Sequence, residues 1–238
     1  MAKGFTFKQF HVNDHGCGMP VSTDGVMLGA WAALPVSGQI LDIGTGSGLL
    51  ALMVAQRTAE HGNAITAIEV DDGAAQAARR NFADSLWAPR IGLAHQTIQG
   101  WASQQPAGSV AAIVCNPPYF NHGEQADCQA RATARHTDTL PHHELLAAIN
   151  HLLSPTGSAS LILPVYEGKQ LIAAAPSHQL YCQRVCEVKT TERKVASRLL
   201  IALSASPSTC QTEQLVIHQG GEYSEAFVAL TKAFYLKM

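Results

Sequence analysis

The chain has 238 residues, of which 47% are hydrophobic, and it carries a formal net charge of −2 with a pI near 6.6. That length suits one domain with a full hydrophobic core, so we expect a single domain over residues 1–238. No apolar run approaches the roughly 18 residues that span a bilayer, and no basic leader with an apolar stretch opens the chain. We therefore expect a cytoplasmic protein without a membrane partner. The near-neutral charge creates no overall field for nucleic acid, so any RNA contact must be local.

The cysteines are scattered, and several lie inside apolar runs rather than in a small disulfide framework, which favours a reducing compartment. They are Cys17, Cys115, Cys128, Cys182, Cys186 and Cys210. Candidate metal-ligand groups lack a second ligand pair at zinc spacing, so we expect no metal site. These groups are His11 with His15 and Cys17, His142 with His143, and Cys182 with Cys186.

From residue 39 the pattern alternates short β-rich apolar runs with helical segments, which predicts βαβ units, a parallel sheet and an α/β fold. The expected strands are 39–43, 64–69, 91–95, 110–115 and 158–163. The expected helices are 49–58, 74–82 and 144–153, and a turn over residues 154–157 should close the last of them. The long irregular connection 119–141 precedes that helix, and loops of this length usually form lids or are mobile.

Beyond residue 164 we expect a helix at 168–175 and two strands, 181–188 and 198–203, that pair as an antiparallel hairpin at the edge of the sheet. The final segment, 224–236, has a helical pattern. Its apolar residues recur at helical spacing, which is more typical of core packing than of a functional motif. They are Phe227, Leu230, Phe234 and Tyr235.

A glycine-rich turn, Asp42-Ile-Gly-Thr-Gly-Ser-Gly, directly follows the first expected strand. Gly44, Gly46 and Gly48 lie where a strand turns into a helix, so backbone N–H groups without neighbouring Cβ atoms can admit a nucleotide-like or zwitterionic ligand. Such turns also serve dinucleotides or hold no ligand at all. The Gly-x-Gly-x-Gly spacing, opened by Asp42, favours S-adenosylmethionine over NAD.

Two acids accompany this turn. Glu69 ends the next strand, about 20 residues on, where its carboxylate can accept hydrogen bonds from both hydroxyls of a ribose, although an exposed acid at a strand end is the alternative. Asp42 can bond the ammonium group of the ligand, directly or through water, or it can hold the turn in shape.

The motif Asn116-Pro-Pro-Tyr119 follows the strand 110–115. The Asn116 side-chain oxygen, which would also border the cofactor, and the Pro117 carbonyl can both accept from an amino group that bears two hydrogens. This clamp favours the pyramidal form of an otherwise delocalised nitrogen, and the protein mainly supplies in-line placement of a methyl that is already activated. Tyr119 would stack on a flat substrate. Two signals at strand ends of one α/β sheet together predict a methyltransferase that acts on nitrogen.

At these residues the chain resembles the class I S-adenosylmethionine-dependent methyltransferases that carry an Asn-Pro-Pro-Tyr motif. Further segments look like the bacterial tRNA(Val) adenine-N6 methyltransferases, which modify the adenine 3′ of the anticodon, position 37. These segments are Lys8-Gln-Phe-His-Val with 23–31, Ala134-Arg-His-Thr137, and the tail 223–236.

This resemblance implies a Rossmann-like, seven-stranded, mostly parallel sheet with helices on both faces and the strand order 3-2-1-4-5-7-6. Residues 1–38 would cap the cofactor and contact RNA, in front of a catalytic core over 39–238. Thr23 and Asp24 would lie near S-adenosylmethionine. The enzyme would be a monomer that needs no protein partner and acts on valine-specific tRNA.

Local groups of basic residues are the candidates for contact with that tRNA, although such groups are more often solvated faces. The expected RNA-binding residues are Lys3, Lys8, Arg135, Lys189, Arg193 and Arg198, with Arg131 and Lys194 as neighbours.

One departure from the family pattern concerns the adenine of the cofactor. Related enzymes usually carry an acid after the third strand, and this chain has Gln96-Thr97-Ile98 there. We therefore expect adenine binding either to rest on the Ile98 backbone or to be weaker, and an acid in place of Thr97 to tighten cofactor binding.

Other functions share parts of this pattern. An N5-glutamine protein methyltransferase uses the same clamp, but such enzymes typically add a helical amino-terminal domain, for which residues 1–38 leave no room. An N-methyltransferase on rRNA is a further alternative. A cofactor-binding RNA chaperone without catalysis is disfavoured by the intact Asn-Pro-Pro-Tyr motif.

Overall fold

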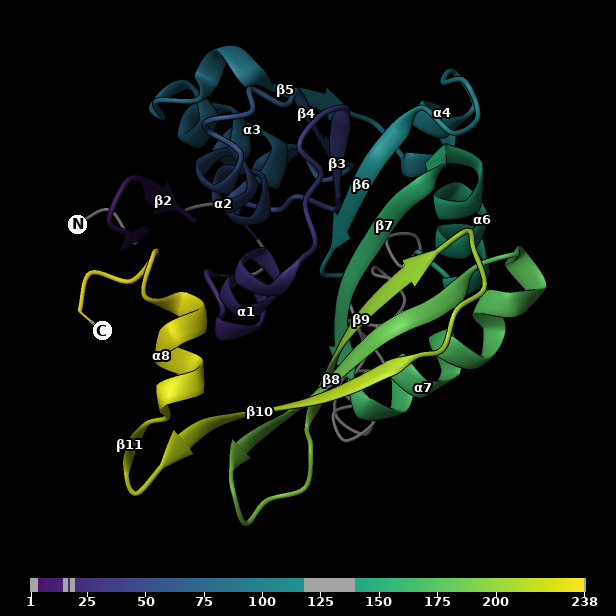
Figure 1. Cartoon of the computed structure of the whole chain (residues 1–238). Helices are drawn as coiled ribbons and strands as arrows, with labels where there is room; N and C mark the ends of the chain where they lie inside the picture. Colours follow the sequence, from purple (N-terminus) through teal and green to yellow (C-terminus); the bar gives the residue numbers. More distant parts are fainter. Residues whose placement is uncertain (1–3, 15–16, 18–19, 118–139, 238) are drawn as a thin grey trace, which may run out of the picture.

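The computed structural model describes residues 4–14, 17, 20–117 and 140–237. A nine-stranded sheet in the order β11-β10-β8-β9-β7-β6-β3-β4-β5 forms its centre (Figure 1). The strands are β3 (Gln39–Ile43), β4 (Ile65–Glu69), β5 (Ile91–His95), β6 (Val110–Cys115), β7 (Leu153–Pro164), β8 (Tyr181–Thr191), β9 (Arg198–Ser204), β10 (Gln211–Gln219) and β11 (Glu222–Tyr223). A separate hairpin pairs β1 (Gly4–Thr6) with β2 (His11–Asn13).

Seven of these strands follow the predicted order, because β5-β4-β3-β6-β7-β9-β8 reads as 3-2-1-4-5-7-6. The α/β fold is therefore confirmed. The expected number of strands was too low, since β10 pairs in parallel with β8 and β11 pairs antiparallel with β10. The antiparallel pair β8 and β9 exists, but it lies inside the sheet rather than at its edge.

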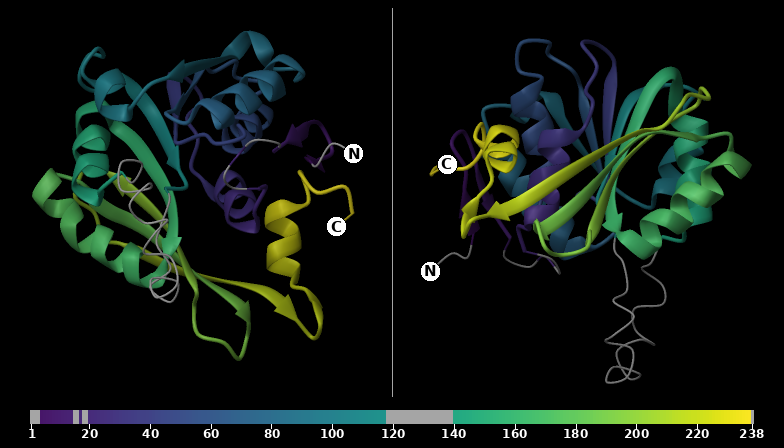
Figure 2. Two further views of the ribbon diagram at one scale, coloured as in Figure 1. Left: turned by 180° about the vertical axis from the view of Figure 1, so that it is seen from behind. Right: turned by 60° about the horizontal axis from the view of Figure 1, so that its bottom comes forward.

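Helices cover both faces of the sheet (Figures 1 and 2). They are α1 (Thr23–Trp31), α2 (Leu49–Arg57), α3 (Asp72–Ala83), α4 (Ile98–Ala102), α6 (His142–Leu152), α7 (Val165–Ala174) and α8 (Glu225–Thr231), with short 3-10 turns at Ala88–Arg90 and Ala175–His178. Helices α1, α2, α3 and α8 share one hydrophobic core with the amino-terminal hairpin. Helices α4, α6 and α7 share a second core on the opposite face. The result is a three-layer sandwich.

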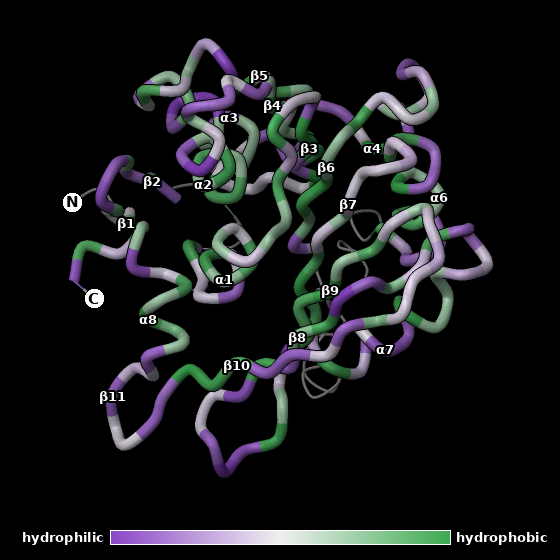
Figure 3. The backbone as a smooth tube through the Cα atoms, viewed as in Figure 1, coloured by the Kyte–Doolittle hydropathy of each residue, from purple (hydrophilic) through white to green (hydrophobic). Residues whose placement is uncertain are grey.

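The central strands are hydrophobic almost throughout, as expected for parallel strands that are covered on both faces (Figure 3). The bounds predicted for β3, β5 and β6 are those observed. The helix ends before residues 154–157 as expected, but this stretch lies inside β7 as an irregularity: Leu153 pairs with Val110 and Ser158 with Ala112, and in the described structure the four residues between them have no pair on β6.

The two ends of the chain pack together (Figures 1 and 2). Lys8 N–H donates to the Phe234 carbonyl, and the ring of Phe7 stacks on that of Phe10 with centroids 4.7 Å apart. The final helix is shorter than predicted, ending at Thr231. The expected core packing is confirmed, since Phe227 and Phe234 are each only 1% exposed.

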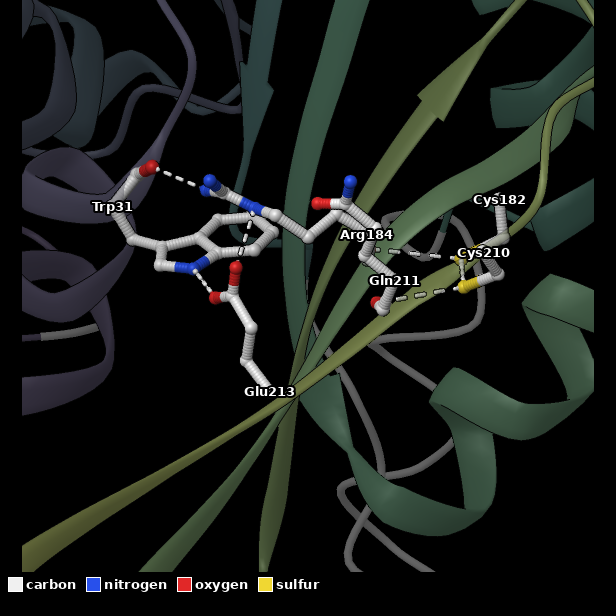
Figure 4. A network of polar contacts seen from close by, with 6 residues as sticks. All are labelled: Trp31, Cys182, Arg184, Cys210, Gln211 and Glu213. Carbon is white, nitrogen blue, oxygen red and sulfur yellow. Dashed lines mark hydrogen bonds and ion pairs between the residues drawn. The ribbon is translucent and has the colours of Figure 1, made fainter.

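A network of polar contacts around Trp31 connects helix α1 to strands β8 and β10 (Figure 4). The Arg184 guanidinium of β8 lies 3.8 Å from the centroid of the Trp31 ring and donates to the Trp31 carbonyl. Glu213 of β10 accepts from the Trp31 indole and pairs with Arg184. The added strand β10 therefore helps to position α1.

No helix in the described part of the chain is long and apolar enough to cross a membrane. The described cysteines, Cys17, Cys115, Cys182, Cys186 and Cys210, are all free thiols.

Candidate active site

Three parallel strands end side by side at one edge of the sheet. In β3, Ile43 pairs with Ile68 of β4 on one side and with Cys115 of β6 on the other. Gly44 and Asn116, which directly follow β3 and β6, and Glu69, the last residue of β4, are therefore neighbours. Ligands of open α/β sheets bind outside this carboxyl edge.

The glycine turn is shaped for a ligand at two of its three glycines. Gly44, Gly46 and Gly48 all have positive φ, at 69°, 57° and 88°. Among the described residues, a Cβ at Gly44 or Gly46 would meet no heavy atom within 4 Å, so the described structure leaves open space beside both. A Cβ at Gly48 would instead come within 2.4 Å of the Phe82 ring. Gly48 thus serves the packing of α2 against α3, whereas Gly44 and Gly46 leave bare backbone for a bound molecule.

Asp42 lies beneath this turn and is fully buried. Its Oδ2 accepts from the Thr45 hydroxyl at 2.5 Å and from the Ala51 amide at 3.1 Å, so this carboxyl holds the turn to the start of α2. Oδ1 is buried and finds no hydrogen-bond partner among the residues that the structure describes. Burial raises the pKa of Asp42 to about 7, against the lowering effect of the bonds from Thr45 and Ala51. A role in shaping the turn is therefore shown, and contact with an ammonium group stays a prediction.

Glu69 is held by backbone N–H groups. Its Oε2 accepts from Gly46 at 2.8 Å, and its Oε1 accepts from Val70 and Asp71, each at 2.9 Å. A carboxylate offers about four acceptor positions, so roughly one remains in this arrangement. The carboxylate can bond one ribose hydroxyl as it stands, and a second hydroxyl would have to replace the Gly46 amide.

Asn116 and Pro117 follow β6 at the centre of the edge. Asn116 Oδ1 is buried and has no partner within the described residues. This oxygen is an acceptor that a donor on a bound molecule could use at this edge of the sheet. Pro117 is buried beside it. Tyr119, the predicted stacking residue, lies outside the described residues.

Thr23 and Asp24 open helix α1, which Ser22 caps by accepting from the Gly25 amide. Asp24 Oδ2 lies 2.7 Å from Arg198 Nε at the start of β9. Arg198 pairs with Pro164, the last residue of β7, so this ion pair joins α1 to the edge that carries Asn116. A predicted cofactor residue and a predicted RNA-binding residue are thus partners of one another. Burial raises the pKa of Tyr235 in the tail, and an interaction with the Thr23 side chain acts in the opposite direction.

Ile98 begins helix α4, directly after β5. Its side chain is buried in the core, 4% exposed, so only its backbone is suited to a ligand. Thr97 is the N-cap of this helix, and its hydroxyl accepts from the Gly100 amide at 3.1 Å. Thr97, at the position where an acid was expected from the family pattern, therefore has a structural role as the cap of this helix.

The basic residues fall into two groups. Lys189 lies near the carboxyl end of β8, and Arg193 lies in the exposed turn between β8 and β9, at the same edge as Asn116. Lys8 lies elsewhere, at the tail, where its Nζ donates to the Lys232 carbonyl at 2.6 Å. Lys3, Arg131 and Arg135 lie outside the described residues.

Two further residues were missed by sequence reasoning. Asn81 of α3 is buried, and its side chain donates to the carbonyl of Ser47 in the glycine turn at 2.7 Å. An Asn inside an Ala-rich helix is the only signal, because asparagine is a poor helix former. Tyr166 follows the end of β7, next to β6, with 58% of its surface exposed. An aromatic residue directly after a strand end could have indicated it.

In the described part of the chain, no group of three or more His, Cys, Asp or Glu side chains could hold a metal ion.

Comparison with known proteins shows the family of this chain. Residues 26–161 match the family model "Methyltransferase small domain". The chain is 62% identical, over 100% of both sequences, to the tRNA1(Val) (adenine(37)-N6)-methyltransferase of Photobacterium profundum. It is 48% identical to the protein of the same name from Vibrio vulnificus (strain YJ016), over 99% of this chain and 97% of that one.

Solved structures share the fold. A predicted O-methyltransferase from Agrobacterium tumefaciens superposes with a TM-score of 0.69 at 18% identity, over 89% of this chain and 96% of that one. The glycopeptide N-methyltransferase MtfA, solved with S-adenosylmethionine, superposes with a TM-score of 0.56 at 14% identity, over 79% and 100% of the two chains. At these identities the likeness shows the fold alone.

Proposed function

Because the chain belongs to the tRNA1(Val) (adenine(37)-N6)-methyltransferase family, we propose that it transfers the methyl group of S-adenosylmethionine to N6 of adenine 37 in a valine tRNA. The observation that carries this proposal is the buried Oδ1 of Asn116, which has no hydrogen-bond partner in the described part of the chain, at the same sheet edge as the open glycine turn. The family and the class of reaction are those expected from the sequence.

The residues around the glycine turn suit the cofactor. The open space beside Gly44 and Gly46 admits a ligand against the backbone, and the acceptor position left on Glu69 suits a ribose hydroxyl. Asp42 holds the turn, and the Ile98 backbone would border the adenine. Thr23 and Asp24 would approach from α1. S-adenosylmethionine, when bound, supplies a sulfonium-activated methyl group, so the protein needs no strong base.

Asn116 and Pro117 would hold the acceptor nitrogen. Asn116 Oδ1 accepts one hydrogen of the adenine amino group, and the Pro117 carbonyl accepts the other. These two acceptors favour the pyramidal nitrogen, whose lone pair can attack, and they stabilise the positive charge that develops on it. Tyr119 would stack on the extruded adenine.

The tRNA would lie across the carboxyl edge of the sheet. Lys189, Arg193 and Arg198 lie at this edge and would contact phosphates, and the exposed ring of Tyr166 would stack on a base beside the target. Lys3, Lys8 and Arg135 complete the proposed RNA contacts. We propose one catalytic unit over residues 1–238 that acts as a monomer, with residues 1–38 beside the cofactor.

Methyl transfer to tRNA tests the proposal. Labelled S-adenosylmethionine is incubated with bulk bacterial tRNA that lacks the modification, and the product is digested to nucleosides. We expect N6-methyladenosine in one valine tRNA, and its loss in Asn116→Ala. Asn63→Ala is the matched control, because Asn63 Oδ1 is also buried without a partner in the described structure, while its amide donates to the Gly38 carbonyl at the opposite edge. Transfer to a protein glutamine instead of tRNA would overturn the proposal.

A further inference from the structure

Two cysteines far apart in the sequence meet between neighbouring strands. Cys210 Sγ lies 3.4 Å from Cys182 Sγ, across 28 positions of sequence. Cys182 belongs to β8, and Cys210 directly precedes β10. The two sulfurs face each other, and Cys182 Sγ also donates to the Arg184 carbonyl at 3.6 Å, which links the pair to the polar network around Trp31 (Figure 4). This pair lies away from the carboxyl edge and takes no part in the proposed transfer.

The two thiols differ in their environment. Cys210 is exposed, whereas Cys182 is partly buried. Burial, and then the hydrogen bond with Cys210, raise the pKa of Cys182 to about 12. Cys182 therefore keeps its proton, and Cys210 is the sulfur that a small reagent from solvent meets first.

The strands leave room for the two sulfurs to join. A disulfide needs a sulfur–sulfur distance of about 2.05 Å, so the sulfurs must approach by roughly 1.4 Å. Cys210 directly precedes β10, whose first pair is Gln211 with Arg184, so Cys210 is not itself paired in the ladder.

We propose that Cys182 and Cys210 form a dithiol site that a hydroperoxide converts reversibly into a disulfide. The Cys210 thiolate attacks one peroxide oxygen, the O–O bond breaks, and a sulfenic acid and hydroxide form. Cys182 Sγ then attacks Cys210 Sγ, the S–O bond breaks, and water leaves with the Cys182 proton. In sum, two thiols and one hydrogen peroxide give one disulfide and two waters.

The crosslink would restrict the segment that carries the surface proposed for RNA. It closes a loop over residues 182–210, which contains Lys189, Arg193 and Arg198. It also joins β8 and β10 next to Arg184 and Glu213, which hold Trp31 of α1. Because a crosslink restricts the unfolded chain more than the folded one, oxidation should raise the melting temperature. The site itself rests on the sulfur geometry alone and does not depend on the proposed methyl transfer.

Mass spectrometry of the full chain tests the site. The reduced protein is treated with a slight excess of hydrogen peroxide, remaining thiols are blocked with N-ethylmaleimide, and unreduced peptides are mapped. We expect a Cys182–Cys210 linked peptide that has lost two hydrogen atoms, a higher melting temperature, and reversal of both by dithiothreitol. Cys210→Ser should abolish both changes, and Cys17→Ser, the control at another partly exposed thiol, should retain them.

Two outcomes would overturn the proposal. In the first, both thiols of the wild-type protein remain open to N-ethylmaleimide after peroxide. In the second, Cys210 proceeds to sulfinic or sulfonic acid while Cys182 stays reduced, which would make Cys210 a simple exposed thiol. Cys182→Ser is the reference for this second outcome. It removes the sulfur that would form the disulfide and leaves Cys210 in place, so its peroxide products show how Cys210 oxidises without a partner.

Discussion

Asn81 binds the backbone of Asn13 through both ends of its side-chain amide. Its Nδ2 donates to the Asn13 carbonyl at 2.9 Å, and its Oδ1 accepts from the Asn13 amide at 3.0 Å. The same Nδ2 donates to the Ser47 carbonyl in the glycine turn. One buried side chain therefore connects the amino-terminal hairpin to the turn proposed to hold the cofactor.

Replacing Asn81 by Ala should loosen that connection. The backbone groups of Asn13 and Ser47 would lose their partner, which costs about 1–3 kcal/mol in the free energy of unfolding. Cofactor affinity should fall as well, since the turn loses its support. Urea unfolding and calorimetry with S-adenosylmethionine measure the two effects. Gln76→Ala on the exposed face of the same helix is the control, and equal effects of both variants would contradict this role.

Replacing Glu69 by Ala tests the binding of the cofactor without tRNA. Glu69→Ala removes the acceptor of three backbone amides, including that of Gly46, and the proposed acceptor of a ribose hydroxyl. The loss of one bond to a charged group, about 1.5–3 kcal/mol, predicts roughly 10- to 100-fold weaker binding of S-adenosylmethionine. Calorimetry measures this affinity. Unchanged binding would mean that Glu69 serves only the backbone of the turn.

The raised pKa of Asp42 predicts how the free energy of unfolding depends on pH. Its folded pKa is raised to about 7 by burial, above the ordinary value of 3.8. The folded state therefore binds a proton on the Asp42 carboxyl more tightly than the unfolded state does. The contribution of this proton to the free energy of unfolding is full below pH 3.8 and is lost as the pH rises through 7. Asp42→Asn has no charge to bury, and its free energy of unfolding should fall less between pH 5 and pH 8. Urea unfolding at these two pH values compares the variants, and parallel changes would contradict the assignment.

Sequence patterns predicted the inner sheet well because parallel strands are buried on both faces and read as apolar runs. They failed at β10, since its first four residues are exposed and polar and the strand has no clear alternation of buried and exposed residues. They also failed at α1, which is buried on most sides and contains Gly25 and Gly29. A Cβ on these glycines would press within 2.9 Å of Leu49 and 2.6 Å of Met53, so both residues serve the close approach of α2.

The candidate site was predictable where one local motif suffices. Strand ends placed Gly44, Glu69 and Asn116 together, as the parallel register shows. Partnerships between distant segments could not be read from the sequence. The pairing of Asp24 with Arg198 needs α1 and β9 to meet, and only the folded chain specifies that contact.

Thr97 allows the cofactor site to be improved. Thr97→Asp should keep the helix cap on the Gly100 amide, because Asp is an equally good N-cap. A second carboxylate oxygen would then be available to the amino group of the cofactor's adenine, so S-adenosylmethionine should bind more tightly. Thr97→Asn, which also caps helices but carries no charge, is the control in calorimetry. No gain for Asp over Thr would remove this interpretation of the departure from the family pattern.

The basic residues at the carboxyl edge of the sheet, Lys189, Arg193 and Arg198, predict a salt-dependent contact with tRNA. Arg193→Ala should raise the KM for tRNA while leaving the KM for S-adenosylmethionine unchanged, because Arg193 lies in the exposed turn after β8 and away from the glycine turn. If its guanidinium binds one phosphate, the slope of log affinity against log salt should fall by about 1. Arg79→Ala is the matched control, since Arg79 is an exposed arginine of α3, on another part of the molecule. Filter binding of tRNA at several salt concentrations measures the slope, and an equal slope for wild type and Arg193→Ala would remove Arg193 from the RNA surface.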